Sequence, residues 1–181
     1  MIVSNIKVNE NKLEEFVRVL LSEEYDILKA NSEKNIYFEI CENFEKIDVV
    51  AILTKEKNFN NYKNNKNSEI KIEICENFKI KNIKEKSVLK KITFSYEKIC
   101  DKYFDQAEVM LKTSIFKIFE KEKDFKWGTL IGVRPTKIVG RFLKMGLSYE
   151  KTLEILRDIY LVSDEKRNLL INIVKKQQKY L

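Results

Sequence analysis

The chain has 181 residues, of which 44% are hydrophobic and none is histidine, and its formal net charge is +7. That length is enough for one substantial core and a second small one. The lack of histidine and the wide spacing of Cys41, Cys75 and Cys100 exclude a histidine-, zinc- or iron–sulfur-dependent enzyme built from this chain alone. We expect the three thiols to be buried.

Neither the N-terminus nor the rest of the sequence carries a membrane signal. The longest apolar runs are much shorter than a bilayer-spanning helix, and the first residues lack the pattern of a cleavable leader. We therefore expect a soluble, cytoplasmic protein without a membrane span.

Two apolar stripes predict helices in the first part of the chain. Apolar and polar side chains partly alternate over residues 2–8, which favours an initial strand. The apolar residues from Leu13 to Leu21 then recur at helical spacing. A longer stripe from Ile99 to Phe119 predicts a second amphipathic helix, which would close this part against a sheet.

The strands of that sheet are predicted between the two helices. Residues 35–41 and 47–53 are rich in Ile, Val, Phe and Tyr, which is typical of paired strands. Residues 69–74 alternate charged and apolar side chains, and strand pairing could continue toward Phe94. The expected fold class is α+β, with a mixed or antiparallel sheet and two packing helices.

Charge and glycine content divide the chain near Phe125. Residues 1–125 carry 23 basic and 23 acidic side chains, whereas residues 126–181 carry 12 and 5, so the whole excess lies in the second part. All four glycines and the single proline also lie there. We predict an α+β domain over residues 1–125 and a basic helical segment over residues 126–181.

Helix signals follow one another in the second part. Pro135 suits a first helical position and Gly146 suits a helix stop. Ser148 is expected to cap the next helix and Ser163 the last one.

The segment WGTLIGVRPTK, residues 127–137, is the most distinctive stretch. It is neither a phosphate loop nor a dinucleotide fingerprint, because its two glycines are too close and no Gly-Lys-Ser/Thr follows. One interpretation is structural: the loop packs tightly and Pro135 starts a helix. The other is that Arg134, Lys137 and Arg141 converge on a carboxylate or phosphate. The candidate anion or interdomain contacts are Trp127, Gly132, Arg134, Pro135, Lys137 and Arg141.

This segment, its continuation KIVGRFLKMGLS and the string YLVSDEKRNLL resemble the region before the catalytic core of HemZ-type coproporphyrinogen dehydrogenases. The resemblance is specific from Trp127 to about Gln178 and weak before it. It implies a radical-SAM enzyme that oxidatively decarboxylates coproporphyrinogen III to protoporphyrinogen IX in haem synthesis without oxygen. Three cysteines of a CxxxCxxC motif hold the family's [4Fe–4S] cluster, which binds S-adenosylmethionine, and this chain lacks that motif.

The resemblance therefore implies an accessory region and not a catalyst. We expect no cofactor in this chain, no catalytic residue, and an end at Leu181 just short of the catalytic domain. The implied partner is the radical-SAM domain of the same polypeptide, with porphyrinogen carboxylates as a further candidate contact.

Two other classes of function stay open. Clustered Lys and Arg would suit a basic nucleic-acid-binding module. A dimerising module would instead expose an apolar patch on the last helix, formed by Leu169, Leu170, Ile173 and Val174.

Overall fold

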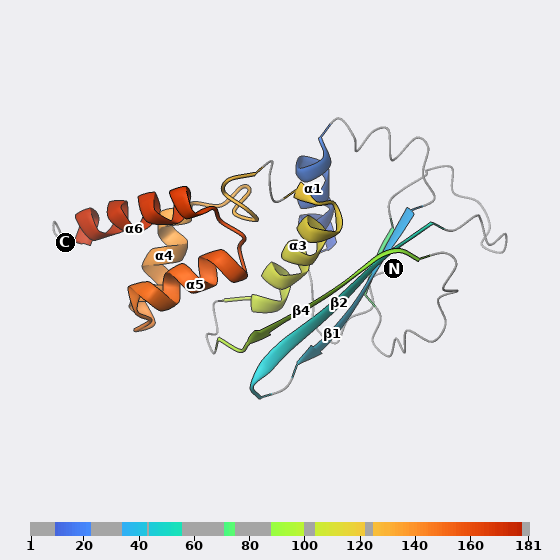
Figure 1. Cartoon of the computed structure of the whole chain (residues 1–181), viewed down its shortest axis with the longest axis horizontal. Helices are drawn as coiled ribbons and strands as arrows, with labels where there is room; N and C mark the ends of the chain where they lie inside the picture. The colour runs from blue at the N-terminus through green and yellow to red at the C-terminus, as the bar shows by residue number, and fades with distance from the viewer. Residues whose placement is uncertain are drawn as a thin grey trace.

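In a computed structural model, the described residues form a sheet, two helices on one of its faces and a group of three C-terminal helices (Figure 1). The residues that the structure describes are 10–22, 34–42, 44–55, 71–74, 88–99, 104–121 and 125–178. The strand predicted over residues 2–8 lies outside them. The α+β class predicted from the sequence is confirmed.

The centre of the sheet is an antiparallel hairpin. Strand β1 (Lys34–Glu42) pairs with β2 (Lys46–Lys55), and Ile40 lies opposite Val49. Both strands were predicted because their β-branched and aromatic residues suit a pleated, half-buried surface.

Two further strands make the sheet mixed. Strand β4 (Val88–Glu97) pairs antiparallel with β2, and the short β3 (Lys71–Ile74) pairs parallel with β1. The strand order is β3-β1-β2-β4, so β4 lies at the edge of the sheet that the described residues form.

Alternation along the strands gives the sheet one apolar face. Ile36 and Phe38 of β1 are fully buried, and the amphipathic helices α1 (Glu10–Leu21) and α3 (Gln106–Ile118) cover this face (Figure 1). Cys41 is exposed, so its predicted burial is wrong, whereas Cys75 and Cys100 lie outside the described residues.

The helical part begins with α4 (Pro135–Lys144), which has Pro135 at its first position as predicted. The helix ends where Gly146 adopts a φ of +84°. There the Gly146 amide donates to the Leu143 carbonyl at 3.0 Å and the Leu147 amide donates to the Phe142 carbonyl at 3.1 Å. This paired arrangement satisfies carbonyls that the helix end would leave free.

The two last helices differ in how they start. Helix α5 (Tyr149–Asp158) is capped by the Ser148 hydroxyl, which accepts from the Lys151 amide at 3.1 Å, as predicted. Helix α6 (Asp164–Gln178) follows Ser163, but the buried Ser163 hydroxyl has no partner among the described residues. The predicted Ser163 side-chain cap is therefore wrong.

One hydrophobic cluster runs through both parts of the chain. Phe104, next to α3, makes an edge-on contact with Phe142 of α4 at 5.3 Å between ring centroids. Leu170 and Val174 of α6 are also in this cluster, at 1% and 4% exposure, whereas Leu169 is 44% exposed and Ile173 is partly buried. Only part of the apolar patch predicted on the last helix therefore lies on the surface. The domain boundary near Phe125 stays a prediction.

Candidate functional site

The loop that carries the Trp-Gly pair packs against the α5–α6 linker, residues 159–163. Gly128 has a φ of +55°, and a Cβ built on it would lie 2.6 Å from the Leu161 carbonyl and closer still to the Tyr160 carbonyl oxygen. The Thr129 amide donates to that same Tyr160 oxygen at 2.8 Å. Only glycine fits this close approach of two backbones.

The linker is held from other sides as well. The Thr113 hydroxyl of α3 donates to the Ile159 carbonyl, and the Ser163 amide donates to the Lys126 carbonyl at 2.9 Å. Between these bonds Leu161 adopts a φ of +55°, which is unusual for a leucine.

An ion pair adds to this contact on its exposed side. The Lys126 ammonium lies 3.0 Å from the Glu165 carboxylate at the start of α6. Its bond to that carboxylate, together with Lys166, holds the pKa of Glu165 below its ordinary value. Trp127 is half-buried against the core, and the Lys166 ammonium lies 5.7 Å from the centre of its ring. Trp127 and Gly128 thus serve packing.

The other candidate residues lie on or before α4. Gly132 is exposed in a turn with a φ of +72°, Arg134 is the N-cap of the helix, and Pro135 is its first residue. The Arg134 side chain is exposed and makes no capping hydrogen bond. Lys137 is exposed too, whereas Arg141 is partly buried.

Helical spacing places the candidate cations along one side of α4. Arg134, Lys137 and Arg141 are three and four residues apart, and Lys144 continues the row. They form a row along the helix, and none of them lines the cleft between β4 and α5. Arg141 does act on a neighbour: burial raises the pKa of Tyr160 well above its ordinary value, and the Arg141 charge opposes that rise.

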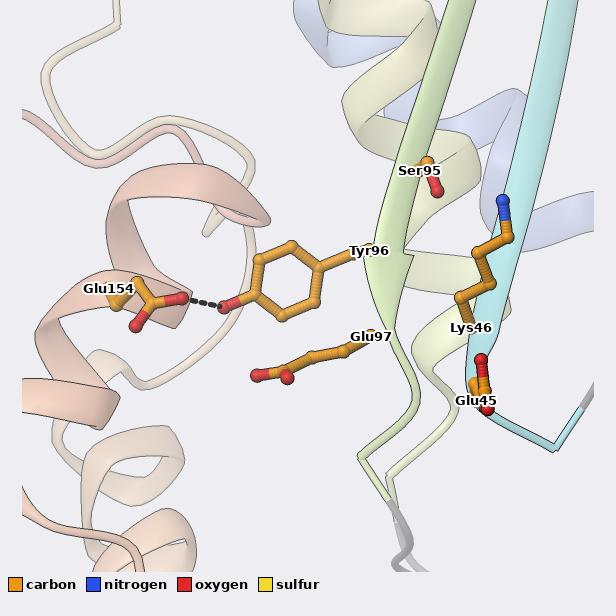
Figure 2. Close-up of a pocket in the computed structure, with 6 residues that line it drawn as sticks. All are labelled: Glu45, Lys46, Ser95, Tyr96, Glu97 and Glu154. Atoms are coloured by element: carbon orange, nitrogen blue, oxygen red, sulfur yellow. Dashed lines mark hydrogen bonds between the residues drawn. The ribbon is translucent and has the colours of Figure 1, made fainter.

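A separate cleft lies between the edge strand β4 and α5, with a volume of about 470 Å³ (Figure 2). Its lining residues are Glu45, Lys46, Ser95, Tyr96, Glu97 and Glu154. The Tyr96 hydroxyl points across the cleft and donates to a Glu154 carboxylate oxygen at 3.0 Å (Figure 2).

Two carboxylates of the cleft, those of Glu97 and Glu154, share one lysine. The Lys151 ammonium contacts the Glu97 carboxylate and lies 2.9 Å from that of Glu154. Burial, and then the bond to Glu154, raises the pKa of Tyr96 to about 12. The bond from Lys151, and then that from Tyr96, lowers the pKa of Glu154. Tyr96 is thus neutral and Glu154 charged at neutral pH. This state suits a structural hydrogen bond between β4 and α5 better than an acid–base pair.

Sequence reasoning missed this cleft. Tyr96 and Glu154 are 58 residues apart. No spacing rule connects them, and only the alternation of β4 indicates that Tyr96 points toward the helices.

Metal ligands do not gather in the part of the chain that the structure describes. Nowhere in these ranges do three or more His, Cys, Asp or Glu side chains form a group that could hold a metal ion. None of the described helices is long and apolar enough to cross a bilayer.

Comparison with known proteins finds one local similarity. A stretch of 52 residues, 29% of this chain, is 44% identical to the oxygen-independent coproporphyrinogen-III oxidase-like protein HemZ of Bacillus subtilis (strain 168). It covers 10% of that protein's length. No family model matches the chain, and no solved structure matches it significantly. The similarity supports a HemZ-like relationship over a small region.

Proposed function

We propose that this chain is a non-catalytic accessory region of a HemZ-like protein. The observation that carries the proposal is the 44% identity over 52 residues to the coproporphyrinogen-III oxidase-like protein HemZ. The parent reaction would be the oxidative decarboxylation of coproporphyrinogen III to protoporphyrinogen IX, which belongs to haem synthesis.

The chemistry of the described residues favours an accessory role. A [4Fe–4S] cluster needs several thiolates that converge within a few ångströms. Cys41 is the one cysteine within the described ranges, and it is exposed on β1, so these residues do not fit the cluster. The cluster and S-adenosylmethionine would therefore be held by a radical-SAM domain of the same polypeptide.

If the proposal holds, the gene encodes a longer polypeptide, and the test compares the chain with that long form. We expect a CxxxCxxC motif downstream of Leu181, and coproporphyrinogen consumption by the reconstituted long form but not by residues 1–181. A reading frame without that motif, or decarboxylation by the 181-residue chain alone, would overturn the proposal. Deleting residues 1–125 from the long form would show whether the α+β part affects turnover.

A nucleic-acid-binding module is the second candidate, and the row of cations on α4 favours it. A chain that tracks phosphates should bind a 20-base-pair duplex at low salt, with affinity falling steeply as salt rises. No binding at low salt would eliminate this candidate.

A further inference from the structure

One side of α4 carries a row of basic side chains. We call it the basic face and define it by Arg134, Lys137, Gly140, Arg141 and Lys144, which recur at helical spacing. Residues 125–149 contain five basic and no acidic side chains. No acidic residue therefore lies in the stretch of sequence that contains this face.

Lysines elsewhere in the described structure are commonly paired. Lys112 and Glu108 approach to 2.7 Å on α3, and Lys90 of β4 lies 2.6 Å from Glu120. By contrast, Arg134, Lys137 and Lys144 are exposed and form no ion pair with any described residue. Charge that is left unpaired along one helix side is available to an external partner.

The start of α4 is electrostatically unfavourable by itself. The N-terminal end of a helix is positive and favours acidic side chains. Helix α4 has no acidic residue in its first turn and instead has Arg134 as N-cap and Lys137 at the third position. In α5, Ser148 caps the helix and Glu150 lies in its first turn. An anionic partner would offset the repulsion at the start of α4.

Gly140 supplies an independent observation. It lies inside α4, where glycine weakens a helix relative to alanine. A Cβ built at this position meets nothing within 4 Å, so no packing inside the described structure requires a glycine. Gly140 is one turn from both Lys137 and Lys144, so it leaves a flat point within the row of cations where a partner backbone could come close.

We infer that the basic face docks an acidic helix of a protein partner. Carboxylates at helical spacing would pair with the cations, and the partner backbone would pass over Gly140. The border of the face favours protein over nucleic acid, because Val133, next to Arg134, is an apolar side chain that is 45% exposed. Apolar side chains among charges are typical of protein interfaces. The inference does not depend on the reaction of a larger protein.

The experiment titrates the 15N-labelled chain with a synthetic helical peptide that has glutamates along one side. A matched peptide with glutamines in their place is the control. We expect the amide signals of residues 134–144 to shift with the glutamate peptide alone, and the affinity to fall as NaCl is added. A 20-base-pair duplex at the same salt should bind at least tenfold more weakly.

Two variants separate docking from stability. Lys137→Glu should weaken peptide binding at least tenfold while raising Tm, because an acidic side chain suits the start of a helix. Gly140→Leu should also weaken binding while leaving Tm equal or higher. Lys91→Glu, the same change of charge at an exposed site on β4, should leave binding unchanged.

Several outcomes would overturn the inference. One is equal shifts with the glutamine peptide, and another is shifts that lie outside α4. Lys137→Glu with unchanged affinity for the glutamate peptide would also contradict it. So would a duplex that binds more tightly than the peptide and shifts the signals of the same residues.

Discussion

The main-chain carbonyl of Tyr160 lies directly against Gly128, in a contact that leaves no room for a side chain on the glycine. Through this contact the loop before α4 packs on the α5–α6 linker. Because the two backbones touch here, their packing requires glycine at position 128.

Gly128→Ala should therefore be severe. The new Cβ would overlap the linker backbone, and the φ of +55° is unfavourable for alanine, so we expect the free energy of unfolding to fall by about 3 kcal/mol. Urea unfolding measures the loss. Gly132→Ala is the matched control: its φ is +72° but its Cβ meets nothing, so it should cost about 1 kcal/mol. Equal losses would show that the close approach is unimportant.

Thr113→Val tests the bond from α3 to the linker. Valine has nearly the same shape as threonine but cannot donate to the Ile159 carbonyl, which would be left buried without this donor. We expect a loss of about 1 to 2 kcal/mol in the free energy of unfolding and faster amide exchange in residues 159–163. In Ser114→Ala the lost hydroxyl bonds only within α3, to the Met110 carbonyl, so the change should cost less. The opposite order would contradict the role given to Thr113.

Tyr96→Phe should change how stability depends on alkaline pH. Burial and Glu154 raise the pKa of Tyr96 to about 12 in the folded chain, above its ordinary value of 10.0. The folded state therefore keeps this proton more tightly, so the stabilisation is complete below about pH 10 and is lost as pH rises toward about 12. Urea unfolding at about pH 9 and about pH 11 should show a steeper fall for the unmodified chain than for Tyr96→Phe. An equal loss of stability between these two pH values in both proteins would contradict the raised pKa of Tyr96.

Two serines that precede helices form a matched pair. Ser148→Ala removes the hydroxyl that accepts from the Lys151 amide, and we expect it to cost about 1 kcal/mol. Ser163→Ala removes a buried hydroxyl without a partner among the described residues, so it should be neutral or slightly stabilising. Thermal unfolding of both variants measures the difference. A larger cost at Ser163 would mean that its hydroxyl has a role in capping α6.

The features predicted from the sequence were those with local causes. The apolar stripe from Leu13 gave α1, and the β-branched runs gave β1 and β2. Pro135 and Gly146 marked the ends of α4 because each has a restricted or unusual backbone preference.

The features that the sequence did not reveal depend on tertiary contacts. At Ser163 the backbone already bonds to Lys126, and the Arg167 guanidinium donates to the Val162 carbonyl at 2.6 Å, so other groups order the start of α6. The cleft between Tyr96 and Glu154 exists only once α5 lies beside β4. The candidate cations could be listed from the sequence, but the isolation of Arg134 and Lys137 from carboxylates became visible only in three dimensions.

The left-handed backbone of Leu161 has a consequence for how distant changes combine. Thr113, Gly128 and Lys126 all act on the short linker that contains it, from α3 on one side and from the loop before α4 on the other. Once one of these contacts is lost, the linker can relax and the others lose part of their effect. Energetic losses at Thr113 and Gly128 should thus be less than additive, which makes the linker a thermodynamic coupling element between α3 and the loop before α4.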